Sequence, residues 1–379
     1  MSDLTPEQRD LVAAVKDFAG RECATREQRL SLTDGDEEPH SHEIAKKMAE
    51  AGWLGIGIPE EYGGSGGELF ETCLFIEQIT QHRLPITTWA ITSIVGATYR
   101  KFATEEVKHE VLGGIARGAV ESIAMSEPGS GSDVASLSTR AEPVEGGYVV
   151  NGQKTWCSNA HLADHILVVV RTSSGGGKHD GLTMLSIPAG TPGMEVRQIA
   201  TMGGREVNDI FFADCFVPIE RLVGVEGQAW AQLIAGLNIE RVIIGALYTG
   251  MAQRAFDQTV AYVQQREQFG QPVGSFQALS QRLADLATEV TCSRLLYRDV
   301  ARKVDRNPEK LLPREASMAK LKASELAKQA CLEGVQMMGG AGYATEFDME
   351  SLLRAAVVGT IVGGTSGIQR DLIAKTYGL

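Results

Sequence analysis

The chain has 379 residues, a net charge of −12 at pH 7 and 43% hydrophobic residues. A chain of this length is long for one compact core and suits two or three packed units. The charge is spread along the chain without a basic run, which argues against nucleic acid and acidic membranes as partners. No run of about 18 apolar residues is present, so no membrane span is expected.

The N-terminal third is predicted to be helical, because apolar residues recur there at helical spacing, as in Leu11, Val15 and Phe18. A glycine-rich turn at 62–67 separates two groups of helices within it. The following segments are short, rich in β-branched residues and separated by Gly, Asn and Pro, which predicts an antiparallel β domain. Helical periodicity returns from Gln228 onward.

This order of helices, strands and helices predicts an α+β fold and argues against alternating βαβ units. We expect an N-terminal helical domain over 1–118, a middle β domain over 119–226 and a C-terminal helical bundle over 227–379. No strand-linked GxGxxG motif is present. The six cysteines lack CxxC spacing and Met1-Ser2-Asp3-Leu4 lacks the features of a secretory signal, so we expect free thiols and a cytoplasmic protein.

Two segments of the β domain have the chemistry to hold a flat, anionic ligand. The segment from Ser126 to Asp133 is a glycine-serine turn, and small residues allow backbone amides and hydroxyls to approach a ligand closely. The segment from Lys154 to Asn159 places an indole beside a hydroxyl. The alternative for the first segment is an ordinary polar turn, which turn preferences alone favour. The alternative for the second segment is a tryptophan that belongs to the core.

Two segments of the C-terminal third are distinctive. The string from Arg266 to Gln277 can be a helix end with a Gly stop and a Pro-containing loop, but that does not require Arg, Phe and Gln at these intervals. The second is Gln336-Met337-Met338-Gly339-Gly340-Ala341-Gly342-Tyr343. Together with the β-domain segments, these strings resemble the acyl-CoA dehydrogenase family over essentially the whole chain, from Leu4-Thr5-Pro6-Glu7-Gln8 to Ile368-Gln369-Arg370.

The resemblance implies an N-terminal helical domain, a middle β domain, a C-terminal four-helix bundle, FAD as cofactor and an acyl-CoA substrate. It implies an electron-transfer flavoprotein as electron acceptor and a homotetramer built as a dimer of dimers. The residues that it assigns to FAD are Met125, Ser126, Gly131, Ser132, Trp156, Ser158, Arg266, Gln268, Phe269, Gln277, Gln336, Gly339, Gly340 and Thr365. Arg266 would pair with the pyrophosphate, and the segments around Arg266 and Gln336 would reach FAD from the neighbouring subunit.

Further positions follow from the same resemblance. Ser132, Asn238 and Arg241 would lie near the CoA part of the substrate. Relatives usually have Glu or Gln where this chain has Gly367, which puts one ribose or adenine contact in question. The backbone amide of Gly363, together with a ribityl hydroxyl of FAD, would bind the thioester oxygen as an oxyanion hole.

The catalytic base is the main departure from the family pattern. Many members carry the base just before a Gly-Thr pair, where this chain has Gly363. A smaller branch, including isovaleryl-CoA dehydrogenase, has its base at the position of Glu240. Helical spacing places Glu240 on one face with Leu237 and Ile244, and an apolar wall raises the pKa of a carboxyl group toward the working pH. The alternative is a structural glutamate paired with Arg241 or a neighbouring helix.

The predicted activity is therefore FAD-dependent α,β-dehydrogenation of an acyl-CoA. The alternatives are a non-catalytic FAD-binding subunit and a flavin oxidase or monooxygenase of the same fold. Trp89, in a helix that lines the acyl pocket in relatives, suggests a short or branched acyl group, but a core tryptophan is the alternative. His161 and His165 are expected to face solvent, and no metal is expected.

Overall fold

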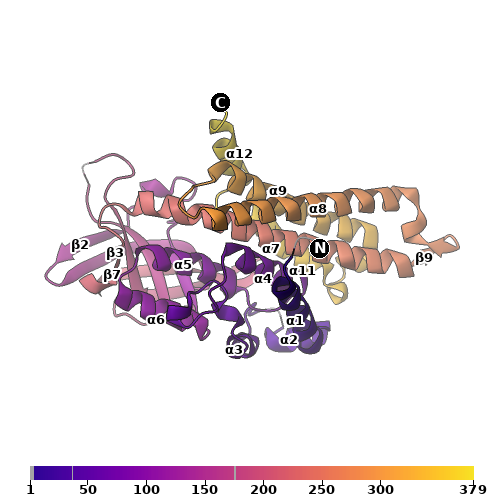
Figure 1. The fold of residues 1–379 in the computed structure, drawn as a ribbon, viewed down its shortest axis with the longest axis horizontal. Coiled ribbons are helices and arrows are strands. Elements are labelled where there is room, and N and C mark those ends of the chain that lie inside the picture. The colour runs from indigo at the N-terminus through magenta and orange to yellow at the C-terminus, as the bar shows by residue number, and fades with distance from the viewer. Residues whose placement is uncertain (1–3, 36, 175) are drawn as a thin grey trace. The chain divides into compact units, whose positions relative to one another are not determined.

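The computed structural model describes residues 4–35, 37–174 and 176–379. Residues 1–3, on which the expectation about a secretory signal partly rests, lie outside the described residues. Six helices precede the sheet: α1 (Pro6–Glu22), α2 (Arg26–Leu32), α3 (His42–Glu50), α4 (Leu69–Gln81), α5 (Thr88–Phe102) and α6 (Glu105–Ala116) (Figure 1). Their starts follow local chemistry, since the Thr5 and Thr104 side chains cap α1 and α6 by accepting backbone N–H bonds.

The middle of the chain forms β1 (Glu121–Ala124), β2 (Arg140–Val144), β3 (Gly147–Ser158), β4 (His165–Arg171), β5 (Leu182–Pro188), β6 (Met194–Thr201), β7 (Gly204–Pro218) and β8 (Leu222–Val223). The sheet order is β6-β7-β3-β2-β4-β5-β8, and β1 pairs with β4. Most pairings are antiparallel as expected, whereas β1 and β2 both run parallel to β4.

The C-terminal part forms α7 (Ala229–Gln265), α8 (Gln277–Arg306), α9 (Pro313–Met338), α10 (Gly340–Tyr343), α11 (Met349–Val357) and α12 (Ser366–Lys375), with β9 (Glu267–Gln268) and β10 (Gln271–Pro272) between α7 and α8. The α+β fold class is confirmed, and helices and strands follow one another in the predicted order. The domain limits at 118 and 226 stay predictions.

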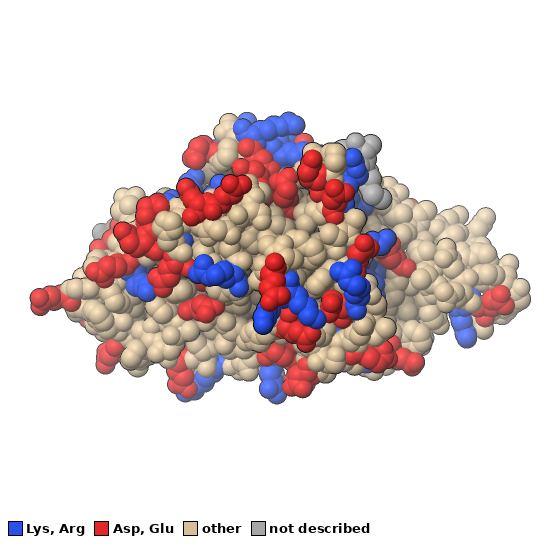
Figure 2. Space-filling model, turned by 60° about the horizontal axis from the view of Figure 1, so that its bottom comes forward, with Lys and Arg blue, Asp and Glu red and all other residues tan. Residues whose placement is uncertain are grey.

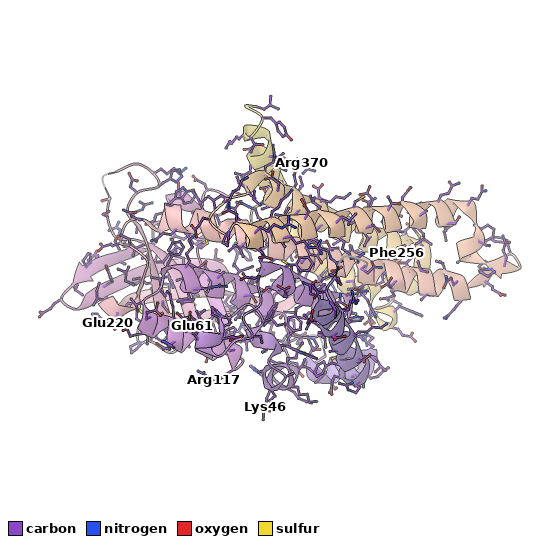
Figure 3. All side chains as sticks on the ribbon, viewed as in Figure 1. Lys46, Glu61, Arg117, Glu220, Phe256 and Arg370 are labelled. Carbon is purple, nitrogen blue, oxygen red and sulfur yellow. The ribbon has the colours of Figure 1, made fainter. Side chains whose placement is uncertain are left out.

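By compactness the described chain divides into two units, and neither is one continuous segment. The first contains residues 1–31, 69–85 and 240–379, and the second contains residues 32–68 and 86–239. In the first unit, α7, α8 and α9 run side by side around a core that includes Ile244, Ala252, Val290 and Ala327 (Figure 1). Figure 3 labels Arg370 on α12. Its side chain forms an ion pair with Glu325 of α9.

A buried polar network ties α4 to α8 in the first unit. Glu77 of α4 is 1% exposed, and its carboxylate accepts hydrogen bonds from Arg294, Tyr297 and Arg298 of α8. Two cations and a hydroxyl thus compensate a carboxylate that would otherwise be costly to bury. The pairing explains why α4, from the N-terminal third, packs with the C-terminal helices.

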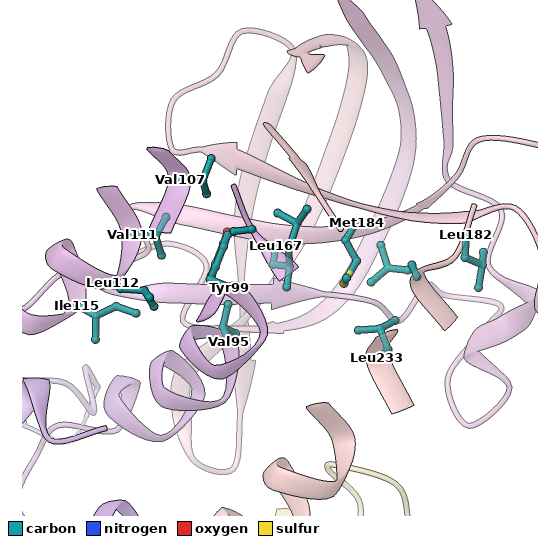
Figure 4. Packing of buried hydrophobic residues seen from close by; sticks show 14 of the residues in the cluster. Val95, Tyr99, Val107, Val111, Leu112, Ile115, Leu167, Leu182, Met184 and Leu233 are labelled. Atoms are coloured by element: carbon teal, nitrogen blue, oxygen red, sulfur yellow. The ribbon is translucent and has the colours of Figure 1, made fainter. Parts of the chain in front are cut away.

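In the second unit, helices α5 and α6 pack on the sheet. Figure 4 shows Val95 and Tyr99 of α5 beside Leu167 of β4 and Met184 of β5, all of them buried (Figure 4). The Tyr99 hydroxyl donates to Ser186 of β5 at 2.7 Å. The five central residues of β4 are all buried, which explains its unbroken apolar run.

Trp89 and α7 both bear on the sequence-based expectations. Trp89 is 3% exposed and its indole N–H donates to the carbonyl of Leu54 at 3.1 Å, which favours the core alternative. By length and composition alone α7 could cross a membrane, although the sequence contains no unbroken run of about 18 apolar residues. Buried residues make up 65% of its most apolar window, as in the core helix of a soluble protein.

On the face drawn in Figure 2, acidic and basic side chains are interspersed (Figure 2).

A chain of charged groups joins α6 to the sheet. His165 of β4 lies between two carboxylates, with Nδ1 3.0 Å from Glu121 of β1 and Nε2 3.0 Å from Glu110 of α6. Glu110 also accepts two hydrogen bonds from Arg221. The expectation that His161 and His165 face solvent was wrong: the His165 side chain is 12% exposed, and His161 lies 3.3 Å from Glu38.

The two carboxylates that contact His165 should respond oppositely to pH. Burial raises the pKa of Glu121 to about 7, against the opposing effect of His165. Although burial alone would raise the pKa of Glu110, Arg221 and His165 lower it. The stabilising contribution of Glu121 is therefore complete below its unfolded pKa of about 4.3 and is lost as the pH rises through about 7, whereas that of Glu110 is lost as the pH falls.

Replacing Glu121 with Gln removes one titration while keeping an acceptor for His165. The variant should gain stability relative to the parent, by about 1 to 3 kcal/mol, as the pH rises from about 5 to about 8. Urea unfolding at several pH values measures this difference. Glu110→Gln is the matched control, and it should lose stability relative to the parent at neutral pH instead. An identical pH trend for both variants would contradict the assignment.

Candidate active site

The glycine-serine segment is a tight loop between β1 and β2. Glu127 and Ser130 exchange two backbone hydrogen bonds across Pro128 and Gly129. The buried carboxylate of Glu127 accepts from the amides of Ser138 and Thr139 and from the Lys154 ammonium, at 2.7 to 2.8 Å. Burial alone would raise the pKa of Glu127, but Lys154 and these hydrogen bonds lower it to about 2. The carboxylate is therefore a permanently ionised anchor for the loop.

Trp156 is presented outward by an irregularity of β3. The pairing with β7 shifts register between Lys154 and Cys157, and Trp156 has a left-handed backbone with φ of +59°. An extra residue in a strand bends it and redirects a side chain. The indole is consequently 61% exposed, whereas Thr155 and Cys157 on either side are buried. The sequence located this aromatic but gave no sign of the bulge.

The loop and the bulge lie side by side in the second unit. The amide of Thr155 donates to the carbonyl of Ser126 at 2.9 Å, and the Lys154 ammonium donates to the carbonyl of Met125 at 3.0 Å. Met125, Ser126 and Ser158 are half-buried, and Gly131 and Ser132 are exposed. A Cβ added at Gly129 or Gly131 would meet nothing within 4 Å. Open backbone next to an exposed indole fits the edge and face of a planar ring system such as a flavin.

Glu240 lies in α7 within the first unit and is half-buried. Among the described residues, its carboxylate takes part in no hydrogen bond or ion pair, either with Arg241 or with a neighbouring helix. Burial raises the pKa of Glu240, against the effects of Arg241 and Lys320, which lower it. A desolvated carboxylate without a partner is suited to accept a proton near neutral pH.

Gly363 lies in the turn before α12, opposite Glu240. A Cβ built on Gly363 would lie 3.3 Å from the Glu240 carboxylate oxygen Oε1 and 2.5 Å from Cδ1 of Ile244. The backbone of Gly363 is left-handed, with φ of +62°, a conformation that other residues adopt at a cost. In the described part of the chain, its amide has no recorded acceptor. A carboxylate and a free backbone donor are thus neighbours at this turn.

Two side chains that the sequence analysis did not assign donate hydrogen bonds to the backbone carbonyls of this turn. Lys320 of α9 donates to the carbonyls of Gly359 and Gly364, and Gln369 of α12 donates to those of Gly363 and Gly364. Gln369 belongs to a string used for the resemblance, but its role was not inferred. A lysine within a helix gives no signal of burial, so Lys320 could not have been found from its spacing.

Thr365 and a groove lie at the start of α12. The Thr365 hydroxyl caps the helix by accepting from the amide of Ile368 at 3.3 Å. A groove of about 540 Å³ runs between this end of α12 and α9, lined among others by Thr365, Ser366, Gly367 and Lys328. In the part of the chain that the structure describes, the buried hydroxyl of Ser366 has no hydrogen-bond partner. A groove of this size with a free hydroxyl can take part of an extended, polar cofactor.

The Arg266 string forms the hairpin β9–β10 between α7 and α8. Phe269 and Gly270 both have positive φ, as in the two-residue turn that suits the twist of a hairpin. Phe269 is 94% exposed, and Arg266, Gln268 and Gln277 are also exposed. Figure 2 shows few charged side chains at the end of the protein that carries this hairpin (Figure 2). Gln336, Gly339 and Gly340, at the end of α9, are exposed as well.

The predicted substrate contacts on α7 are only partly accessible. Asn238 is buried; its amide nitrogen donates to the carbonyl of Ile234, while its oxygen has no partner among the described residues. Arg241 is half-buried, its Nε has no partner, and burial lowers its pKa. Free polar atoms on both residues leave capacity for a ligand. Within residues 4–35, 37–174 and 176–379, no group of three or more His, Cys, Asp or Glu residues could hold a metal ion.

Family models for the N-terminal, middle and C-terminal domains of acyl-CoA dehydrogenase match residues 5–119, 122–215 and 227–378. The chain belongs to the acyl-CoA dehydrogenase family, as the sequence motifs predicted. It is therefore an oxidoreductase, and its cofactor is FAD.

Individual relatives match over nearly their whole length. The chain is 37% identical to a probable acyl-CoA dehydrogenase, YngJ, of Bacillus subtilis, covering 98% of each chain. It is 33% identical to a mitochondrial isovaleryl-CoA dehydrogenase of Solanum tuberosum, covering 97% of this chain and 90% of the relative. The crystal structure of acyl-CoA dehydrogenase from Geobacillus kaustophilus is 30% identical with a TM-score of 0.93, covering 100% and 99%.

Proposed function

We propose that the protein catalyses α,β-dehydrogenation of an acyl-CoA thioester to a 2-enoyl-CoA, with Glu240 as the base. The observation that carries this proposal is the unpaired carboxylate of Glu240, which lies 3.3 Å from where a side chain at position 363 would begin. Burial raises its pKa, so that it can take up the α-proton at neutral pH. Bound FAD would supply the acceptor for the hydride of the β-carbon.

The turn at Gly363 supplies the second half of the proton transfer. Removing an α-proton places negative charge on the thioester oxygen, and a fixed donor near that oxygen stabilises the charge. The Gly363 amide has no recorded acceptor among the described residues, so it can act as this donor. We assign Ser132, Asn238 and Arg241 to the CoA part of the substrate.

The remaining predicted contacts are assigned to FAD. In the second unit these are Met125, Ser126, Gly131, Ser132, Trp156 and Ser158, which gather around the loop and the bulge. In the first unit, Thr365 lies at the groove, and Arg266, Gln268, Phe269, Gln277, Gln336, Gly339 and Gly340 are exposed. Exposure of an arginine and a phenylalanine at one hairpin favours contact with FAD of a neighbouring subunit, in a homotetramer built as a dimer of dimers.

The substrate class and electron acceptor complete the proposal. The base position on α7 and the relative named isovaleryl-CoA dehydrogenase favour a short, branched acyl group. We assign an electron-transfer flavoprotein as acceptor and a cytoplasmic location. An oxidase of the same fold is the second candidate, and the 61% exposure of Trp156, which we assign to FAD, is the feature that favours it. Anaerobic mixing with a panel of acyl-CoAs, followed by admission of oxygen, separates the two.

Replacing Glu240 with Gln keeps the shape of the side chain and removes the proton acceptor. The variant should retain FAD and lose at least about 100-fold of the anaerobic flavin-reduction rate. Glu43→Gln is the matched control, since Glu43 is an exposed carboxylate paired with Lys47, and it should reduce flavin at the parent rate. A Glu240→Gln variant within about tenfold of the parent would exclude Glu240 as the base.

The base should be transferable to position 363 if Ile244 is shortened. A Cβ at Gly363 meets Cδ1 of Ile244 at 2.5 Å, and valine lacks that atom. We expect Glu240→Gly with Gly363→Glu to recover little activity, and the addition of Ile244→Val to recover more. Recovery should be incomplete, because the left-handed backbone of residue 363 costs about 1 to 2 kcal/mol for a residue with a Cβ.

The readout is the anaerobic flavin-reduction rate on matched acyl-CoAs, compared with Glu240→Gly alone. Glu240→Gly with Ile244→Val is the control for the effect of the valine. If the triple variant binds FAD and ligand normally yet reduces no faster than this control, positions 240 and 363 do not serve the same carbon atom.

Arg266→Ala tests the contact across a subunit boundary. Loss of a cation on the pyrophosphate should weaken FAD retention and assembly together, because ligand binding and association are linked. Flavin content and mass by light scattering, at several protein concentrations, measure both. Arg197→Ala, at an exposed arginine of β6, is the control. An Arg266→Ala protein with full flavin and the parent mass would refute the contact.

A further inference from the structure

Lys320 of α9 is fully buried, which is unusual for a lysine. Its ammonium donates to the carbonyl of Gly359 at 2.9 Å and to that of Gly364 at 2.8 Å. Burying an ammonium costs several kcal/mol unless it is compensated. Two carbonyl oxygens compensate part of this cost, and they fix both ends of the turn that contains Gly363.

The turn has a backbone conformation that favours glycine, and side-chain hydrogen bonds hold it in place. Gly363 and Gly364 both have left-handed φ, of +62° and +84°. Gln369 donates to the carbonyls of Gly363 and Gly364 at 3.0 and 3.1 Å. Lys320 and Gln369 therefore engage carbonyl oxygens of the turn, while the Gly363 amide stays without a recorded acceptor in the described chain. The two side chains fix the turn without using its donor.

Lys320 differs from Gln369 in its charge, which acts on Glu240. The positive charges of Lys320 and Arg241 oppose the rise that burial causes in the pKa of Glu240. Burial lowers the pKa of Lys320 to about 8, and Glu240 and Glu325 oppose that change while Arg241 adds to it. Arg241 and Lys320 are thus the cations, and Glu240 and Glu325 the carboxylates, that act on this pair.

We propose that Lys320 is a positioning residue for the dehydrogenation, with two linked effects. It holds the turn from Gly359 to Gly364 so that the Gly363 amide can meet the thioester oxygen, and its charge stabilises the ionised form of Glu240. This rests on the proposed function, because it takes Glu240 as the base. The two effects can be separated, since Gln369 supports the same turn without a charge.

The test compares Lys320→Met, which loses both charge and donors, with Gln369→Leu, which loses donors only. The acidic limb of the anaerobic flavin-reduction rate should move to higher pH in Lys320→Met, by about 0.5 to 1 unit, because ionised Glu240 loses a neighbouring cation. Gln369→Leu should slow the reaction and leave the limb in place. Lys320→Arg keeps the charge and should restore the limb to the parent position with a lower rate.

Flavin content and thermal unfolding of each variant are measured in parallel. If Lys320→Met is recovered without flavin, Lys320→Gln takes its place, since it keeps a donor, lacks the charge and should show the same shift. If the acidic limb of the pH–rate profile does not move in the variant that retains flavin, the proposal is overturned. Lys320 is then a structural residue. Full activity of Glu240→Gln would instead overturn the proposed function, so the two failures are distinguishable.

Discussion

The carboxylate of Glu240 lies beside the space that a side chain at position 363 would enter, and this proximity constrains the rest of the site. A Cβ at Gly363 would be 3.3 Å from Oε1 of Glu240 and closer still to Ile244. Two carboxylates this close would repel, and one would be protonated. One base, from α7 or from the turn, is what the local geometry accommodates. A glycine at 363 leaves room for both Glu240 and Ile244.

Three carboxylates in this protein, two of them buried and one half-buried, illustrate how their surroundings decide their chemistry. Glu127 has Lys154 and several N–H donors, its pKa falls to about 2, and it anchors a loop. Glu121 shares one histidine with Glu110, and burial raises its pKa to about 7. Glu240 has no hydrogen bond or ion pair among the described residues, and burial raises its pKa against two cations. A carboxylate is expected to be reactive where charges at a distance compensate its burial, and where hydrogen bonds and ion pairs do not.

The sequence predicted the fold class, the family and FAD, because strand-forming segments and family strings are local properties of the chain. It did not predict features that depend on tertiary contacts. Trp156 is exposed because β3 is irregular at that point, His165 is enclosed because Glu110 comes from another element, and Lys320 is buried by the turn after α11. A polar residue in a helix or strand looks solvated in the sequence whether or not a partner covers it. The roles of the individual site residues stay predictions.

Placing the base on a long helix also has a consequence for the oxyanion donor. If residue 363 carried the base, the same residue would have to position a carboxylate with its side chain and present its backbone amide to the substrate. With Glu240 on α7, the backbone of Gly363 can take a left-handed conformation at little cost, and its carbonyl neighbours can be fixed by Lys320 and Gln369. Base and donor then belong to separate elements, each held by its own contacts. Substitutions on α7 should therefore change proton transfer without moving the donor, whereas substitutions beneath the turn change both.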